Sequence, residues 1–144
     1  MASISKEEEQ EGECCRLREM RGDRLPGWVG VDLDGTLAEA LPSFHPEIIG
    51  RPLEPMMEKV KEMLLVGYEV RIFTARATMG AGAISAVKAW LHRNGLPDLP
   101  VTATKDAELM FFYDDRAIQV EHNTGRARWA DQAAYFRRKP ENRR

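Results

Sequence analysis

The chain has 144 residues, of which 43% are hydrophobic and 31% charged, and its formal net charge is −2. This length fits one domain with its own core, and the composition excludes disordered and fibrous classes. No apolar run is long enough to span a membrane and the N-terminal region is rich in Glu, so we expect no transmembrane helix, no signal peptide and a cytoplasmic location. The two cysteines, Cys14 and Cys15, are adjacent and match neither a disulfide framework nor a zinc site, which fits a reducing compartment.

Charge and turn signals divide the chain into three parts. Residues 1–24 hold a run of charged residues with few large apolar side chains, and we expect a flexible charged tail there. Residues 25–138 begin at a Leu-Pro-Gly turn signal and are predicted to form a single domain. Residues 139–144 are expected to be a basic C-terminal tail, since residues 126–144 contain seven Lys or Arg and only two Asp or Glu.

The apolar patterns alternate between strand and helix along the domain. Strands are expected at residues 28–33, 68–74 and, more weakly, 99–103, and helices at 56–66 and 82–94. The stretch 39–55 holds four prolines and a glycine and is expected to be a loop. The order strand, helix, strand, helix, strand predicts an α/β fold, a parallel sheet with helices on both faces.

The last third of the domain is less regular. A short helical turn is expected at residues 107–110, followed by the aromatic run 111–113 as a fourth strand. Residues 118–120 are a candidate further strand, and residues 128–138 are expected to be helical.

Polar residues follow each of the four expected strands. These residues are Asp32 and Asp34, Thr74, Lys105, and Asp114 with Asp115. The carboxyl ends of parallel strands meet at one edge of a sheet, and ligands bind at that edge in open α/β sheets. The four strands are therefore expected to bring this set together in one site.

The residue types in this set suggest phosphoryl-transfer chemistry. Four clustered carboxylates repel each other unless a cation lies between them, and an all-oxygen site suits Mg²⁺. Thr74 and Lys105 could bind the oxygens of a transferring phosphoryl group. One carboxylate can attack phosphorus as a nucleophile, while another moves the proton of the leaving oxygen and of the attacking water.

Four motifs in this order resemble those of the haloacid dehalogenase superfamily. They are Val31-Asp32-Leu33-Asp34-Gly35-Thr36-Leu37, Ile72-Phe73-Thr74-Ala75-Arg76, Lys105, and Tyr113-Asp114-Asp115-Arg116. The resemblance implies that Asp32 is the nucleophile and a Mg²⁺ ligand, and that Asp34 is the general acid/base with its main-chain carbonyl on the metal. It also implies that Thr74 and Lys105 bind phosphate and that Asp114 and Asp115 complete the metal shell.

The resemblance further implies a three-layer Rossmann-like fold of the small members without a cap domain, because the intervals 36–69 and 75–104 are too short for an inserted cap. An aspartate at position 34 favours phosphate esters over carbon–halogen bonds as substrates. The implied function is a Mg²⁺-dependent phosphomonoester hydrolase acting on a phosphorylated small molecule or polynucleotide end. An uncapped site is open, and a second subunit of a homo-oligomer could supply its lid.

Several alternatives remain at this point. Arg76 could bind a substrate phosphate or form a salt bridge with a neighbouring carboxylate, and for Arg116 we favour the salt bridge. Ser43, in the loop after the first motif, is expected to be solvated rather than to contact substrate. A receiver-like phospho-aspartate signalling module and an inactive binding protein of the same fold are the alternative functions.

Overall fold

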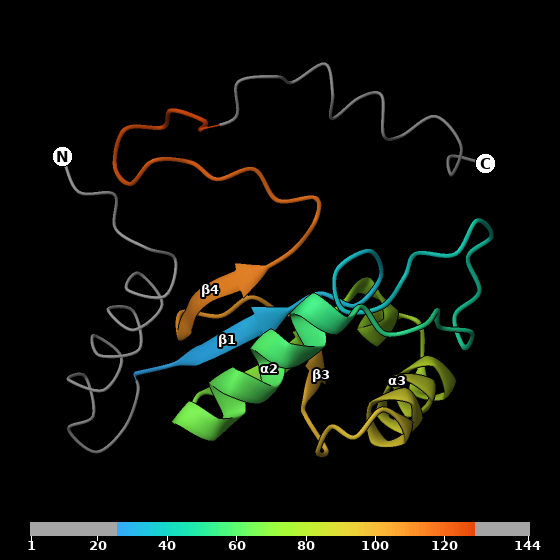
Figure 1. Ribbon diagram of the computed structural model, residues 1–144. Helices are drawn as coiled ribbons and strands as arrows, with labels where there is room; N and C mark the ends of the chain where they lie inside the picture. The colour runs from blue at the N-terminus through green and yellow to red at the C-terminus, as the bar shows by residue number, and fades with distance from the viewer. Residues whose placement is uncertain (1–25, 129–144) are drawn as a thin grey trace, which may run out of the picture.

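The structure is a computed structural model, and it describes residues 26–128. Its elements in chain order (Figure 1) are β1 (Trp28–Val31), α2 (Glu54–Val66), β2 (Glu69–Phe73), the 3₁₀ helix η1 (Ala75–Thr78), α3 (Ala81–Arg93), β3 (Val101–Thr102) and β4 (Leu109–Tyr113). The tails expected at 1–24 and 139–144, and nearly all of the helix expected at 128–138, lie outside the described residues.

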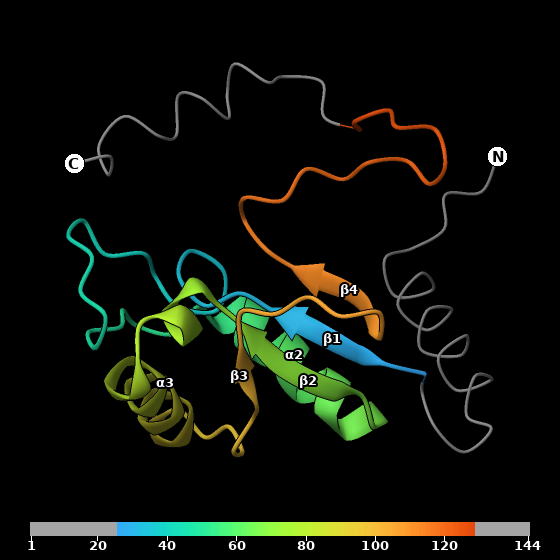
Figure 2. The ribbon, with the colours of Figure 1, turned by 180° about the vertical axis from the view of Figure 1, so that it is seen from behind.

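The four strands form one parallel sheet in the order β3-β2-β1-β4 (Figure 2). Val31, the last residue of β1, is paired with Ile72 of β2 and with Tyr113 of β4. The residues that follow β1, β2 and β4 therefore emerge at the same edge of the sheet. The expected α/β class and parallel sheet are confirmed.

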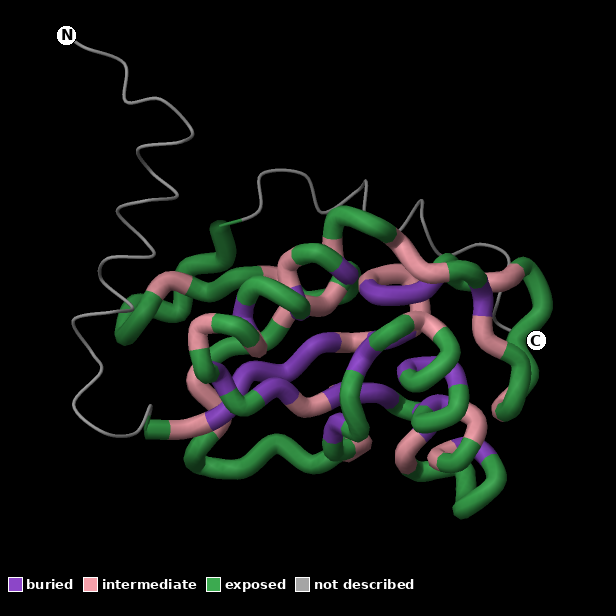
Figure 3. Tube along the Cα trace, turned by 60° about the horizontal axis from the view of Figure 1, so that its bottom comes forward, coloured by how far each residue is buried: buried purple, intermediate pink, exposed green. Residues whose placement is uncertain are grey.

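The hydrophobic core lies on one face of this sheet. Alternate residues of β1 and β2 point into it and are fully or almost fully buried, which Figure 3 shows as the purple segments at the centre of the tube. Both helices pack into the same core, through Met57, Val60 and Met63 of α2 and Val87, Trp90 and Leu91 of α3. This arrangement is expected when successive right-handed crossovers step in the same direction across a sheet.

Within residues 26–128, the opposite face of the sheet carries aromatic side chains and no helix. The ring of Phe73 contacts those of Trp28 and Phe112 edge to face, with centroids 6.1 and 5.7 Å apart. The connection 103–108 leads from β3 to β4, and its Asp106 accepts a hydrogen bond from Trp28 Nε1 at 2.8 Å. Within residues 26–128 both helices pack into the core on one face, and the connection 103–108 is too short to contain a helix.

Smaller differences concern the end of the domain. Residues 107–108 form a turn and β4 begins at Leu109, where a helical turn was expected over 107–110. Residues 118–120 form no strand, and Val120 makes only an isolated antiparallel bridge with Ala127. Within the described part of the chain, no helix combines the length and hydropathy needed to cross a membrane.

Candidate active site

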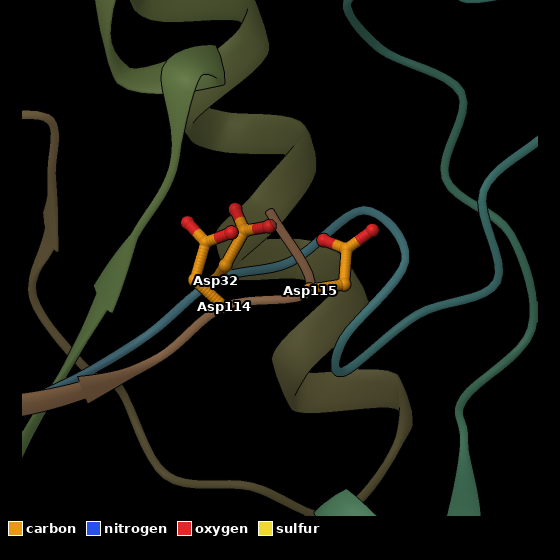
Figure 4. Close-up of side chains that lie close together, drawn as sticks. All are labelled: Asp32, Asp114 and Asp115. Atoms are coloured by element: carbon orange, nitrogen blue, oxygen red, sulfur yellow. The ribbon is translucent and has the colours of Figure 1, made fainter. Parts of the chain in front are cut away.

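Three carboxylates meet at the carboxyl edge of the sheet. Asp32 follows β1 and its main-chain N–H donates to the carbonyl of Tyr113 at 2.9 Å, which fixes the end of β1 beside the end of β4. Asp114 and Asp115 directly follow β4. Each of the three residues offers a carboxylate oxygen within 4.8 Å of the others, and Figure 4 shows the three groups pointing to the same side. A hard divalent cation fits such a set of oxygen ligands.

The turn after β1 positions the third carboxylate. The main-chain N–H of Asp115 donates to Thr36 Oγ1 at 3.1 Å, and the same hydroxyl donates to Asp115 Oδ1 at 3.3 Å. Gly35 has a φ of +85°, and a Cβ atom there would lie 2.6 Å from Asp115 Oδ2. Glycine is thus required at position 35 both by the backbone conformation and by the close approach of Asp115.

The carboxyl group of Asp32 is difficult to ionise in this setting. Its pKa is raised from 3.8 to about 7, most strongly by burial and next by the charge of Asp114. Asp115 and Asp34 add to the increase, whereas a hydrogen bond from the main-chain N–H of Leu33 opposes it. A cation among the three carboxylates would favour the ionised form of Asp32, which is the form needed for nucleophilic attack.

Asp34 does not join the three carboxylates but pairs with Arg76. Arg76 Nε lies 2.8 Å from Asp34 Oδ2, and Nη2 lies 2.7 Å from Oδ1. The arginine side chain is only 2% exposed, whereas that of Asp34 is 26% exposed. The remaining donors of Arg76 reach the carbonyl oxygens of His45, Pro46 and Ile48 at 2.7 to 3.0 Å. Of the two roles expected for Arg76, the structure therefore shows the salt bridge with a neighbouring carboxylate.

Thr74 lies where expected, at the end of β2, and is almost completely buried. Its main-chain N–H donates to the carbonyl of Thr102 at 2.9 Å, which joins it to the end of β3. Its hydroxyl oxygen accepts from the main-chain N–H of Arg76 at 3.2 Å. The hydroxyl proton can therefore be directed toward a ligand.

A cleft of about 1000 Å³ opens over this edge of the sheet. Asp32, Asp34, Thr74, Arg76 and Asp114 all line it, so the structure brings five of the predicted site residues to one cavity. The other lining side chains come mainly from the loop after β1 and from the segment around η1: Leu41, Pro42, Ser43, Phe44, Thr78 and Met79. Ser43, which we expected to be solvated, is exposed and also lines the cleft.

Lys105 was expected to bind phosphate but does not line the cleft, whereas Arg116 was expected to form a salt bridge and does line it. Lys105 is exposed in the connection 103–108, and from that connection only Ala103 lines the cleft. Arg116, for which a salt bridge was favoured, lines the cleft and forms no salt bridge within the described residues. Its position directly after Asp114-Asp115 was the only sequence signal for a role in the site.

Comparisons with protein-family models, with curated proteins and with solved structures give no match to this chain. The interpretation of the site therefore rests on its own geometry and chemistry.

Proposed function

We propose that this protein is a Mg²⁺-dependent phosphomonoester hydrolase of the haloacid dehalogenase type, with Asp32 as the nucleophile. The observation that carries the proposal is the approach of Asp32, Asp114 and Asp115 to within 4.8 Å at the carboxyl edge of a parallel sheet, beside a cleft. Clustered carboxylates with an opposing cavity suit a bound cation and a phosphorylated ligand.

The carboxylates of Asp32, Asp114 and Asp115, with the main-chain carbonyl of Asp34, would hold the Mg²⁺ ion. Three carboxylates from two adjacent strand ends fit a hard cation that accepts oxygen ligands and retains waters. When bound, the ion supplies positive charge that offsets the repulsion between these carboxylates and the phosphate dianion.

Asp32 and Asp34 would divide the chemistry between them. An Asp32 carboxylate oxygen attacks phosphorus while the bond to the ester oxygen breaks, and protonated Asp34 donates its proton to that leaving oxygen. Asp34 then takes a proton from a water molecule that attacks the aspartyl-phosphate, which releases inorganic phosphate and regenerates both residues. Each oxygen of Asp34 bonded to Arg76 retains a second lone pair for this proton.

Two groups of the cleft would bind the phosphate oxygens. The Thr74 hydroxyl donates one hydrogen bond, and Arg116 supplies a cation from the wall of the cleft. Lys105 was expected in this role from the sequence, but the lining position of Arg116 favours the arginine. Arg76 would act as a positioning residue for Asp34, since its five N–H groups already have protein partners.

The proposal also includes the absence of a cap domain and a cytoplasmic location. The loop after β1 and the segment between β2 and β3 contain no inserted sheet or helical domain within residues 26–128. A second copy of the chain could cover the open cleft.

The test is hydrolysis of an aryl phosphate by the full-length chain with Mg²⁺, compared with Asp32→Asn and with addition of EDTA. We expect turnover that falls at least about 10³-fold in the variant and is lost with EDTA. Substantial activity in Asp32→Asn would overturn the role of Asp32. A stable phosphorylated Asp32 without turnover would instead favour a receiver-like module, and neither phosphorylation nor turnover would favour a binding protein.

A further inference from the structure

The cleft has an aromatic wall that the proposed chemistry does not use. Phe44 lines the cleft, and its side chain is 52% exposed, which is unusual for a large aromatic residue. Met79, 40% exposed, lines the same cleft from the end of η1. The cleft therefore combines an acidic end, formed by Asp32 and Asp114, with an apolar wall.

Arg76 supports one face of the Phe44 ring. The guanidinium carbon of Arg76 lies 4.6 Å from the ring centroid, over one face of the ring. Because Arg76 is buried, the exposed surface of Phe44 belongs to the opposite face and the ring edge. The chain just after the ring is also held, since Arg76 binds the carbonyl oxygens of His45 and Pro46.

A ring fixed in this way is a suitable stacking surface. An aromatic side chain that is already ordered loses little conformational entropy when a second flat ring stacks on it. Sugar phosphates and other purely aliphatic phosphate esters offer no flat ring for such a surface. Ser43 and Thr78 also line the cleft, and although Thr78 Oγ1 donates to the carbonyl of Ala75 at 2.8 Å, both hydroxyl oxygens can accept from the hydroxyls of a sugar.

We propose that the leaving group of the substrate is a nucleoside, whose base stacks on the free face of Phe44 while its phosphate lies at Asp32. This inference rests on the proposed phosphatase function and adds the substrate class. A nucleoside has both a flat ring and a sugar, so it matches the ring of Phe44 and the hydroxyls of the cleft together. Tyrosine phosphate shares the ring but lacks the sugar.

The experiment compares substrates that differ only in the base. Nucleoside 5′-monophosphates and ribose 5-phosphate are hydrolysed by the wild-type chain and by Phe44→Ala and Phe44→Trp. We expect kcat/KM for the nucleotides to exceed that for ribose 5-phosphate. Phe44→Ala should lower the nucleotide value by about 5- to 100-fold, the range for loss of one base–aromatic stack, while ribose 5-phosphate changes less than about twofold. Phe44→Trp should retain the preference.

Ile48→Ala is the matched control, because the Ile48 side chain is exposed in the same loop but does not line the cleft, and its carbonyl remains for Arg76. It should leave both kcat/KM values unchanged. An equal loss for both substrates in Phe44→Ala, or a preference for tyrosine phosphate, would overturn the nucleoside inference while leaving the phosphatase function intact. Absence of hydrolysis of every ester would overturn both. Nucleoside 3′-monophosphates and end-phosphorylated oligonucleotides, tested in parallel, distinguish free nucleotides from polynucleotide ends as the source of the nucleoside.

Discussion

Arg76 donates two parallel hydrogen bonds to the carboxylate of Asp34, from Nε to Oδ2 at 2.8 Å and from Nη2 to Oδ1 at 2.7 Å. The same guanidinium binds three carbonyl oxygens of the loop after β1 and lies against the ring of Phe44. One buried side chain thus connects the proposed acid/base residue to the wall of the cleft.

Replacing Arg76 should destabilise the protein and disturb the site together. Arg76→Ala removes the partner of a partly buried carboxylate and leaves three carbonyls without a donor, and we expect a loss of about 3 kcal/mol in the free energy of unfolding. Arg76→Lys keeps the charge but not the fork, so it should recover only part of the loss. Urea denaturation followed by circular dichroism measures the free energy of unfolding of both variants. Equal stability of Arg76→Lys and wild type would contradict the importance of the fork.

Asp32 should make the metal-free protein less stable as the pH rises. Its pKa is about 7 in the folded chain and 3.8 in the reference state, so between these values the folded chain binds more protons than the unfolded chain. The contribution of Asp32 to stability therefore falls from about pH 4 to pH 7 and stays low above that, and Mg²⁺ should restore it.

The measurement is the melting temperature of wild type and Asp32→Asn, with and without Mg²⁺, from pH 5 to pH 8. Without metal, the asparagine variant should be the more stable of the two at pH 8 by about 2 kcal/mol, and the difference should shrink toward pH 5. If the variant were less stable than wild type at pH 8 without metal, ionised Asp32 would not be unfavourable in the folded protein.

Gly35→Ala should weaken divalent-cation binding as well as the fold. The added methyl group would lie against Asp115 Oδ2, and the positive φ is itself unfavourable for alanine by about 1 kcal/mol. Gly95→Ala is the control, because Gly95 has a similar φ of +79° with nothing within 4 Å of its Cβ position. Calorimetric titration with Mg²⁺ should show at least about tenfold weaker binding only in Gly35→Ala. Similar metal affinity in the two variants would rule out this role of the glycine.

The proposed roles of Arg116 and Lys105 can be distinguished by two measurements, KM for a phosphate ester and the inhibition constant of inorganic phosphate. Arg116→Ala should raise KM for a phosphate ester and the inhibition constant of inorganic phosphate by about tenfold or more, because a charge-assisted contact is lost from the cleft. Lys105→Ala should change both by less than about twofold, since Lys105 does not line the cleft. The reverse outcome would show that the connection 103–108 moves its lysine to the phosphate.

The sequence was sufficient to predict the strands and helices that carry strong periodic patterns. The apolar alternation of β2 and the helical spacing of α2 and α3 specify their types, and an Asp-x-Asp-Gly pattern after a buried strand specifies a turn. From the order of strands it followed that Asp32, Thr74 and Asp114 would share an edge, and the structure confirms that they line one cleft.

The sequence could not specify which hydrogen-bond and ion-pair partners each charged side chain finds in the folded protein. Arg76 and Arg116 both line the cleft, and the path of the loop after β1, whose carbonyl groups accept hydrogen bonds from Arg76, gives Arg76 its protein partners. The side of the sheet on which a connection passes is likewise a tertiary property, and residues 103–108 cross the face opposite the helices without a periodic pattern that could indicate it.

Among residues 26–128, β4 is the last strand in sequence, yet it lies beside β1, the first. Two of the three clustered carboxylates arrive with it, so the acidic cluster exists only after the most distant pairing of the sheet has formed. Of the described residues, a chain that has emerged only as far as β3 contains both helices and most of the apolar core, but not the carboxylates of Asp114 and Asp115. The proposed metal site is therefore complete only once β4 has paired with β1.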